Sequence, residues 1–430
     1  MKRWMLIAIF LIAGIAATAG PRLMAAAPCV QMKPAVNPGP NAALLYFRAF
    51  LLTPPINYIP KKYLATYPLG TPMDKIIRQL GQSAQASLRL LHRAAELANC
   101  RWGIGGDRYG PTVLLPELAK ASQLTNWVIL EARIAIAEHH FHRAIRDYTD
   151  GIMLARAIGR DKTIIGTLVE YSLRERLNWM LADNLTQLPP PALDHLAAAL
   201  SRLPAPTPIS YGIIAENQGK IAWLKRLIRT GRTYQFLKDS VGVSYFLRPG
   251  KLYYPAWTAL KSILKSKSTS KVYWKKEAYK SICALEHYNK RLRRILALPY
   301  PQSISALKKL QPLHPPLTKP LIATGGYVQE IPHPPHHFPL DDVANLLLPS
   351  PSNTNGGYAV QCRAIAQTAM LRAAVAYLRG GRKAFDAVKD PFGKGPFMLK
   401  KTGKKLVIQS ALNVSTIYNK HPSTLTVKLK

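Results

Sequence analysis

Three histidines lie close together in AEHHFHRAIRD, residues 137–147, and they are the first candidates for metal chemistry. A helical zinc-protease site places two histidines four residues apart, so that both reach one metal and leave room for a glutamate base. Here His139 and His142 are three apart and share a face only if one helix runs through the segment. The apolar stripes on either side require a chain reversal in order to face each other. We therefore expect a turn here and no metal site.

A second group of histidines lies in HPPHHF, where His333, His336 and His337 are mixed with prolines. Prolines keep such a segment extended, and neighbouring side chains of an extended chain point to opposite sides. We expect a solvent-exposed loop. His337 with Asp342 marks the alternative function that the sequence leaves open, an exported hydrolase whose site is assembled from distant residues.

The carboxylates of the central segment are arranged like those of a solvated helix face. Asp147 and Asp150 share one side of a predicted helix, and each follows an arginine by four residues. Glu170 and Arg174 repeat this spacing. Ion pairs at this spacing stabilise exposed helices, so the pattern favours a charged surface over an acid–base pair.

No pattern in the chain marks a nucleophile or a cofactor site. No serine lies in a GxSxG segment, and the glycines of NCRWGIGGDRYG lack the GxGxxG spacing of a dinucleotide site. We therefore predict no catalytic residue, no metal ligand and no cofactor. Four cysteines could form disulfides in an oxidising compartment or remain buried thiols, and the sequence leaves both open. They are Cys29, Cys100, Cys283 and Cys362.

A basic segment with aromatic residues is the strongest compositional signal. Residues 261–300 contain eleven Lys and Arg against two Glu. Lysines neutralise phosphates while aromatic rings stack on a ligand, as in sequence-tolerant polyanion sites. The residues predicted to bind an anionic partner are Lys271, Tyr273, Trp274, Lys275 and Lys276.

The net charge of the whole chain agrees with a polyanionic partner. Lys and Arg number 59 against 22 Asp and Glu, which gives a formal net charge of +37 and a pI near 10.2. Such a field attracts nucleic acid, anionic lipid or acidic glycan without selecting among them, and a generally basic protein would show it too. The predicted partner is an anionic cell-envelope component or a protein, and nucleic acid is disfavoured because export is expected.

The first residues predict export. Lys2 and Arg3 precede the apolar run from Trp4 to Ala19, which ends in the small residues Ala17-Thr18-Ala19. Sixteen residues are typical of a signal peptide and short for a membrane span. We predict a periplasmic or extracellular protein, with an uncleaved N-terminal membrane anchor as the alternative.

The elements that carry these residues are mostly helical. Apolar residues recur at spacings of three and four through 71–204, which predicts one helix from Thr71, another from Pro116 and a later one capped by Asp161. Residues 215–228 predict an amphipathic helix, 341–348 a helical turn, and 359–381 a long helix that stops at paired glycines. FMLKKTGKKLVI and the alternating Leu425, Val427 and Leu429 predict a small β element. The fold class is mainly α, an irregular array of helical hairpins with a small C-terminal β-hairpin or strand. The predicted regions are a signal peptide at 1–19, an N-terminal segment at 20–70 that is extended and contains a short helix, a helical-hairpin domain at 71–204, a basic helical region at 205–300, a Pro/His-rich connection at 301–357, and a long helix with a β tail at 358–430.

FHRAIRDYTDGIMLA, residues 141–155, resembles the second helix of a tetratricopeptide repeat. Phe141, Ala144 and Tyr148 take the places of that motif's aromatic, small and aromatic residues, and Gly151 stands where a small residue is usual. The 34-residue period of such repeats does not recur clearly. The resemblance therefore implies one repeat-like hairpin.

A wider resemblance covers most of the chain. NCRWGI, the segment from LLPELAKASQ to LVEYSL, DDVANLLLPS and DPFGKGPFMLKK are similar to an uncharacterised family of exported bacterial helical proteins. In that family a Cys-x-Trp segment precedes a helical hairpin, and a DPF-x-G-x-P segment leads into a tail similar to that of type II secretion pseudopilins. This chain lacks the Tyr-Ser-x-Gly strand and the acidic end after Val407. The resemblance implies a fold and an exported location but no catalytic residue.

Overall fold

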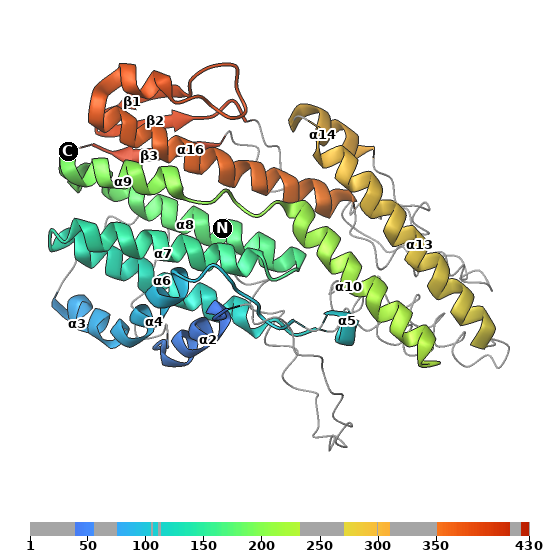
Figure 1. The fold of residues 1–430 in the computed structure, drawn as a ribbon. Coiled ribbons are helices and arrows are strands. Elements are labelled where there is room, and N and C mark those ends of the chain that lie inside the picture. Colours follow the sequence, from blue (N-terminus) through green and yellow to red (C-terminus); the bar gives the residue numbers. More distant parts are fainter. Residues whose placement is uncertain are drawn as a thin grey trace, which may run out of the picture.

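The computed structural model describes residues 39–55, 75–104, 106–110, 113–232, 271–298, 300–309, 351–412 and 423–429. Most of these residues are helical, and one three-stranded antiparallel sheet lies near the C-terminus (Figure 1). The prediction of a mainly α protein with a small C-terminal β element is confirmed.

Three long helices form the centre of the bundle: α6 (Pro116–Ala137), α7 (Phe141–Gly159) and α8 (Ile164–Asn184). Proline suits the first turn of α6 because its missing N–H would have no helical partner there. Every residue of α6 from 124 to 136 is buried, which requires neighbours on all sides. Both α7 and α8 pack on α6 and on each other.

The histidine segment forms the reversal between α6 and α7, as predicted. His139 adopts a left-handed conformation with φ 62°, and its N–H donates to the Ile136 carbonyl at 3.1 Å. The N–H of His140 donates to the Ala135 carbonyl at 2.7 Å. These two bonds make the Schellman motif that ends many helices, in which glycine usually holds the left-handed position.

The start of α8 differs from the predicted cap at Asp161. Thr163 is the N-cap, and its hydroxyl accepts the N–H of Gly166 at 2.9 Å. The Asp161 carboxylate instead accepts the N–H and the hydroxyl of Thr163, at 2.8 and 2.7 Å. The prediction was therefore wrong by two residues, because an aspartate can hold a capping threonine in place as well as cap a helix itself.

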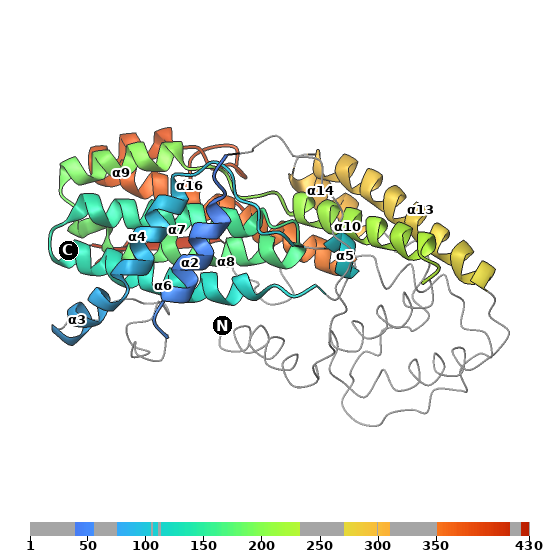
Figure 2. The same ribbon diagram turned by 60° about the horizontal axis from the view of Figure 1, so that its bottom comes forward.

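An outer layer of three helices covers one side of the bundle: α2 (Ala42–Leu52), α3 (Lys75–Ser83) and α4 (Gln85–Ala95). This layer lies against α6 and α7, on the side away from the sheet (Figures 1 and 2). A single helix was predicted from Thr71 onward, but the chain turns at Ala84 and forms two helices. The predicted helix start, residues 71–74, lies outside the described residues.

The Cys-x-Trp segment fastens α2 to the bundle. Asn41, the N-cap of α2, donates to the Arg101 carbonyl and accepts the Arg101 N–H, both at 2.8 Å. The Trp102 ring stacks on Phe50 with centroids 6.0 Å apart, and its Nε1 donates to the Ala157 carbonyl of α7 at 2.8 Å. The tryptophan therefore joins α2 to α7.

The other side of the bundle is covered by α9 (Pro190–Arg202) and α16 (Pro351–Ala387). Between α8 and α9 lies the short 3-10 helix η3 (Leu185–Gln187). The helix predicted at 359–381 begins eight residues earlier, at Pro351. It is broken at the predicted glycines, where Gly381 has φ 65°, and residues 382–387 form a further helical segment.

Two helices lie side by side and extend beyond the bundle: α10 (Ile209–Arg229) and α13 (Lys271–Leu296) (Figures 1 and 2). The short helix α5 (Gly106–Tyr109) packs on α10, and α14 (Tyr300–Lys308) packs on α13 and α16. The sequence did not predict α14. The predicted helical turn at 341–348 lies outside the described residues.

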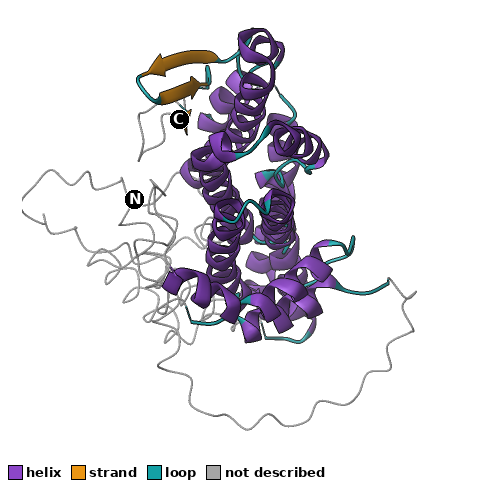
Figure 3. Ribbon diagram, turned by 90° about the vertical axis from the view of Figure 1, so that its left-hand side faces the viewer, coloured by secondary structure: helices purple, strands orange, loops and turns teal. Residues whose placement is uncertain are grey.

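The sheet has the order β1 (Met398–Thr402), β2 (Lys405–Gln409), β3 (Thr424–Lys428), and it stands at one end of the helical layers (Figure 3). The predicted hairpin is confirmed, with Gly403 at φ 53° in the turn. The predicted alternation holds for Leu425 and Val427, which are buried while Thr426 between them is half-buried; Leu429 lies after β3 and is half-buried.

Asp390 of the DPF-x-G-x-P segment ties the end of the α16 segment to the sheet. Its carboxylate is buried and accepts the N–H of Phe392 at 3.0 Å, the hydroxyl of Ser410 at 2.9 Å and the N–H of Ala411 at 2.6 Å. A carboxylate with several backbone donors is a strong structural anchor.

Candidate functional site

The three histidines of the α6–α7 turn are surface residues. His139, His140 and His142 are all exposed, and the His142 ring lies 4.5 Å from the His195 ring of α9, centroid to centroid. Within the ranges given above, no three His, Cys, Asp or Glu side chains are placed to hold a metal ion. The HPPHHF histidines and Asp342 lie outside the described residues, and so does the alternative hydrolase site that they would form.

Glu170 and Arg174 correct the prediction of a solvated face. Their side chains are 0% and 1% exposed, and Arg174 Nε donates to Glu170 Oε1 at 2.8 Å. The carboxylate also accepts the N–H of Thr207 at 3.2 Å. It packs so closely on Gly159 that a Cβ there would lie 2.7 Å from Glu170 Cδ. The pair is part of the core, and the spacing of the two residues could not reveal this because exposed pairs share it.

Asp147 and Asp150 also differ from the predicted exposed pair. Burial raises the pKa of Asp147 to about 7, against the opposing effect of Arg143. Asp150 is buried, and its Oδ2 lies 3.0 Å from Nδ1 of His92 on α4. The other ring nitrogen of His92 lies 3.3 Å from Glu96. A histidine between two carboxylates suits a structural bridge between α4 and α7 better than a general base.

Three further carboxylates lie near one another: Glu117 in the first turn of α6, Asp161 just before α8, and Glu216 on α10. Burial raises the pKa of Glu117, and it raises the pKa of Asp161 to about 7, with smaller contributions from Glu117 and Glu216. Glu216 accepts the N–H of Ile164 at 3.0 Å and lies 2.9 Å from Lys220 Nζ. This cluster can hold a proton near neutral pH, which makes it a pH-dependent structural joint.

The three described cysteines form no disulfide with one another. Cys283 is exposed, Cys100 is half-buried and Cys362 is buried. Burial raises the pKa of Cys100 and of Cys362 to about 12, so neither is a reactive thiolate at neutral pH. Cys29 lies outside the described residues, and a disulfide with it stays a prediction.

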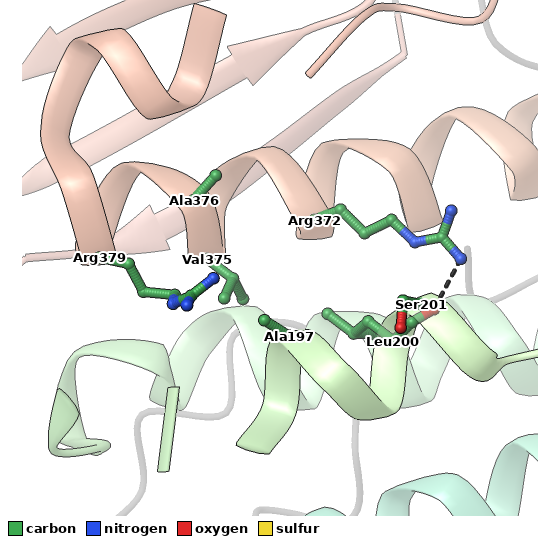
Figure 4. A pocket seen from close by; sticks show the side chains of 7 residues that line it. All are labelled: Ala197, Leu200, Ser201, Arg372, Val375, Ala376 and Arg379. Carbon is green, nitrogen blue, oxygen red and sulfur yellow. Dashed lines mark hydrogen bonds between the residues drawn. The ribbon is translucent and has the colours of Figure 1, made fainter. Parts of the chain in front are cut away.

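A shallow pocket of about 270 Å³ lies between α9 and α16 (Figure 4). Two arginines reach it, but each already has a protein partner. Arg372 donates to the Leu200 carbonyl at 2.6 Å, and Arg379 donates to Asp194 at 2.6 Å. The two guanidinium groups therefore stabilise the packing of α16 on α9.

The α10–α13 arm has an apolar side and a basic side. The buried side of α13 packs on α10 and α14, and buried Asn217 of α10 donates to Asn289 of α13 at 2.8 Å. The buried side of α13 consists of Ala278, Ile282, Leu285, Tyr288 and Leu292. These residues recur at spacings of three and four and, together with buried Ser281 and Asn289, form one side of the helix, so the opposite side faces outward.

The outward side of the arm carries cations from both helices. Its exposed basic residues are Lys225, Arg226, Arg229, Arg232, Lys275, Lys280, Lys290, Arg293 and Arg294. Among the described side chains of α10 and α13, the exposed acidic one is Glu286, which lies 3.6 Å from Lys225. Tyr279 is also exposed among the lysines. We call this side the basic face of the arm.

The predicted anion-binding residues lie at the first turns of α13. Lys275 is exposed on the basic face. The backbone of Lys271, Tyr273, Trp274 and Lys276 is helical, and the positions of their side chains lie outside the described part of the structure. The sequence prediction missed the cations of α10, although KRLIRTGR at the end of a predicted amphipathic helix was the available signal.

A second basic group consists of Lys400, Lys401, Lys404 and Lys405 on the β-hairpin and of Lys394 in the turn that precedes it. For Lys400 and Lys401 there is a structural reason, because β1 is an edge strand of the sheet in the described part of the chain. Lysines on an edge strand oppose pairing with the strands of other molecules. The helical arm has no such requirement, so its cations are the better candidates for binding.

Comparison with protein-family models, with curated proteins and with solved structures finds no match for this chain. The resemblance to exported bacterial helical proteins therefore stays a prediction. The predicted signal peptide, residues 1–19, lies outside the described residues, and none of the described helices is long and apolar enough to cross a membrane.

Proposed function

We propose that this chain is an exported, non-enzymatic helical protein that binds an anionic component of the cell envelope through the basic face of the arm. The observation that carries the proposal is the gathering of nine exposed cations on α10, α13 and the turn after α10, with one exposed glutamate among their described side chains. The shared chemistry of the ligand is a dense array of phosphate groups, as on an anionic lipid surface or a phosphate polymer.

The strength of such binding follows from the number of cations. Each Lys or Arg close to an anionic membrane surface contributes about 1 kcal/mol. Several of them acting together therefore give useful affinity even though each charge is exposed. Exposed charges are screened by salt, so the affinity should fall steeply as ionic strength rises.

The bundle supplies a rigid base for the arm. The repeat-like hairpin of α6 and α7 fits the proposed scaffold, because Ala144 and Tyr148 are buried and Phe141 is half-buried. Helical hairpins stacked in this way commonly present extended binding surfaces. The arm extends from one end of this base, where α10 also contacts α8 and α16.

The test compares two variants that each lose four positive charges. The arm variant carries Arg229→Gln, Lys275→Gln, Lys290→Gln and Arg294→Gln. The control carries Lys394→Gln, Lys400→Gln, Lys401→Gln and Lys404→Gln on and just before the hairpin. Binding to phosphatidylglycerol vesicles and to soluble long-chain polyphosphate is measured over a salt series. The arm variant should lose about a hundredfold or more in affinity, and the control much less.

The two ligands separate the two sources of phosphate. Binding to the vesicles alone assigns a lipid headgroup, and binding to polyphosphate alone assigns a soluble polymer. Equal losses in the two variants would mean that the attraction is a property of the net charge, and this result would contradict the proposal.

A further inference from the structure

Helix α2 has large apolar side chains on both of its sides. Tyr46, Ala49 and Phe50 are buried against the bundle. On the opposite side, Leu44 is 64% exposed and Leu51 is 85% exposed. Phe47 and Leu52 lie beside them at 36% and 52% exposed, and Arg48 is exposed among them. We call these five outward residues the outer face of α2.

Such a face is unusual for a helix in contact with water. A helix that is apolar all round is normally covered on every side, and contiguous exposed apolar patches mark contact sites. The other large apolar side chains that are exposed in the described ranges are scattered over the fold. They are Tyr109, Leu114, Ile165, Tyr211, Tyr279, Leu298 and Met398.

The outer face is also held in place before any partner binds. Asn41 and Trp102 fix α2 to the bundle, and the Ala42 N–H donates to the Asn99 carbonyl at 2.8 Å. Phe47 packs edge-on against Trp102, with centroids 5.3 Å apart. The exposed leucines therefore stand on a rigid helix.

The charges around the outer face are mainly positive. Arg48 lies within it, and Arg101 belongs to the segment that holds α2. Arg89 and Arg93 are exposed on α4, which packs beside α2. The exposed acidic residue of α4 and its C-cap is Glu96. Apolar side chains framed by arginines are the pattern of helices that lie in the headgroup region of anionic membranes.

We propose that α2 is an interfacial helix that inserts its outer face into the surface of an anionic lipid bilayer. Its 11 residues make a helix of about 16 Å, far short of the roughly 30 Å hydrocarbon core, so it would lie in the membrane plane. The inference rests on the proposed function only in placing the chain at the cell envelope. The proposed contact uses the outer face of α2 instead of the basic face of the arm, and it depends on apolar insertion instead of electrostatic attraction.

The sequence places this helix within reach of a membrane. The predicted signal segment ends at Ala19, and a stretch of 22 residues separates it from Ala42. A chain of that length spans at most about 75 Å. While the apolar run is held in a membrane, before cleavage or as an uncleaved anchor, α2 therefore stays within that distance of the same surface.

The test uses the full chain with Leu44→Ser, Leu51→Ser and Leu52→Ser, all of which are exposed and leave the bundle core intact. The matched control carries Leu114→Ser, Ile165→Ser and Leu298→Ser. The probe is vesicles of phosphatidylcholine and phosphatidylglycerol with brominated acyl chains, which quench nearby tryptophan. The signal of Trp102 is obtained as the difference between chains with and without Trp102→Phe. Phenylalanine keeps an aromatic ring beside Tyr46 and Phe50 and loses the bond to the Ala157 carbonyl, so circular dichroism and urea denaturation first check that this chain is folded.

Quenching of Trp102 should be strong in the native chain and in the control, and it should fall about tenfold or more in the α2 variant. It should also persist at salt concentrations that abolish binding through the arm, because insertion is apolar. The readout is local to α2, so it is independent of whether the N-terminal run or the arm also holds the chain on the vesicle.

Two results would overturn the inference. One is equal quenching of Trp102 in the α2 variant and the control. The other is a loss of self-association in the α2 variant, measured by analytical ultracentrifugation, without any change in quenching, since a second copy of the chain would then be the partner. If the arm variant and the hairpin control bind vesicles equally in the earlier experiment, the expected quenching of Trp102 does not change. The two proposals can therefore be contradicted separately.

Discussion

At the scale of single residues, the buried pair of Glu170 and Arg174 shows how a charge pattern can be misleading. Its spacing is that of a surface ion pair, yet both side chains are in the core. The signal that could have located it is a small residue on a neighbouring helix, Gly159, which leaves room for the carboxylate. Gly159 indicates a buried carboxylate on α8 only once α7 is known to pack on α8.

This pair leads to a prediction for two glycines in helices. Gly159→Ala should lower the free energy of unfolding by about 1–3 kcal/mol, because its Cβ would displace the Glu170 carboxylate, which is buried and bonded to Arg174. Gly356→Ala is the matched control, since a Cβ there meets no heavy atom within 4 Å. Higher helix propensity should stabilise that variant by about 0.5–1 kcal/mol. Urea denaturation measures both, and a stabilising Gly159→Ala would show that the contact is not tight.

At the scale of elements, sequence patterns located most helices and the β-hairpin. The helix starting at Pro116, the turn at His139 and the glycine break in α16 follow from proline, glycine and apolar spacing. The patterns missed α14 and the separation of α3 from α4, because short helices take much of their stability from tertiary contacts. For the candidate site, the sequence showed the positive charge of α13. The packing of α13 on α10 is a long-range contact, which the spacing of apolar residues does not encode.

The joint between α16 and the sheet gives an element-scale prediction. Asp390→Ala removes the acceptor for Phe392, Ser410 and Ala411, and should cost about 2–4 kcal/mol in the free energy of unfolding. Asp386→Ala is the control, because Asp386 forms a partly exposed pair with Arg382 and should change stability by less than about 1 kcal/mol. Equal effects of the two substitutions would show that Asp390 is no anchor.

At the scale of the whole molecule, burial of carboxylates links stability to pH. The pKa of Asp161 is raised to about 7 in the folded chain, against about 4 in an unfolded one. The folded state therefore holds a proton that the unfolded state releases between about pH 4 and pH 7. The contribution of Asp161 to stability is thus fully present below this window and is lost as pH rises through it.

Asp161→Asn tests this link, since asparagine keeps an acceptor for Thr163 and cannot ionise. Relative to the native chain, the variant should gain stability as pH rises from about 4 to about 7, as measured by urea denaturation at each pH. Asp194→Asn, which removes a carboxylate from a largely exposed pair with Arg379, is the matched control for the loss of one negative charge. A constant difference between the native chain and Asp161→Asn at all pH values would contradict the raised pKa.

The net charge of +37 also belongs to this scale, because it attracts any polyanion and the question is where a ligand settles. The most direct measurement is the acetylation rate of individual lysines by mass spectrometry, with and without phosphatidylglycerol vesicles. If the basic face of the arm is the binding site, Lys225, Lys275, Lys280 and Lys290 become protected while Lys400, Lys401 and Lys404 of the hairpin keep their reactivity. Uniform protection of all these lysines, or protection of the hairpin alone, would contradict the proposed function.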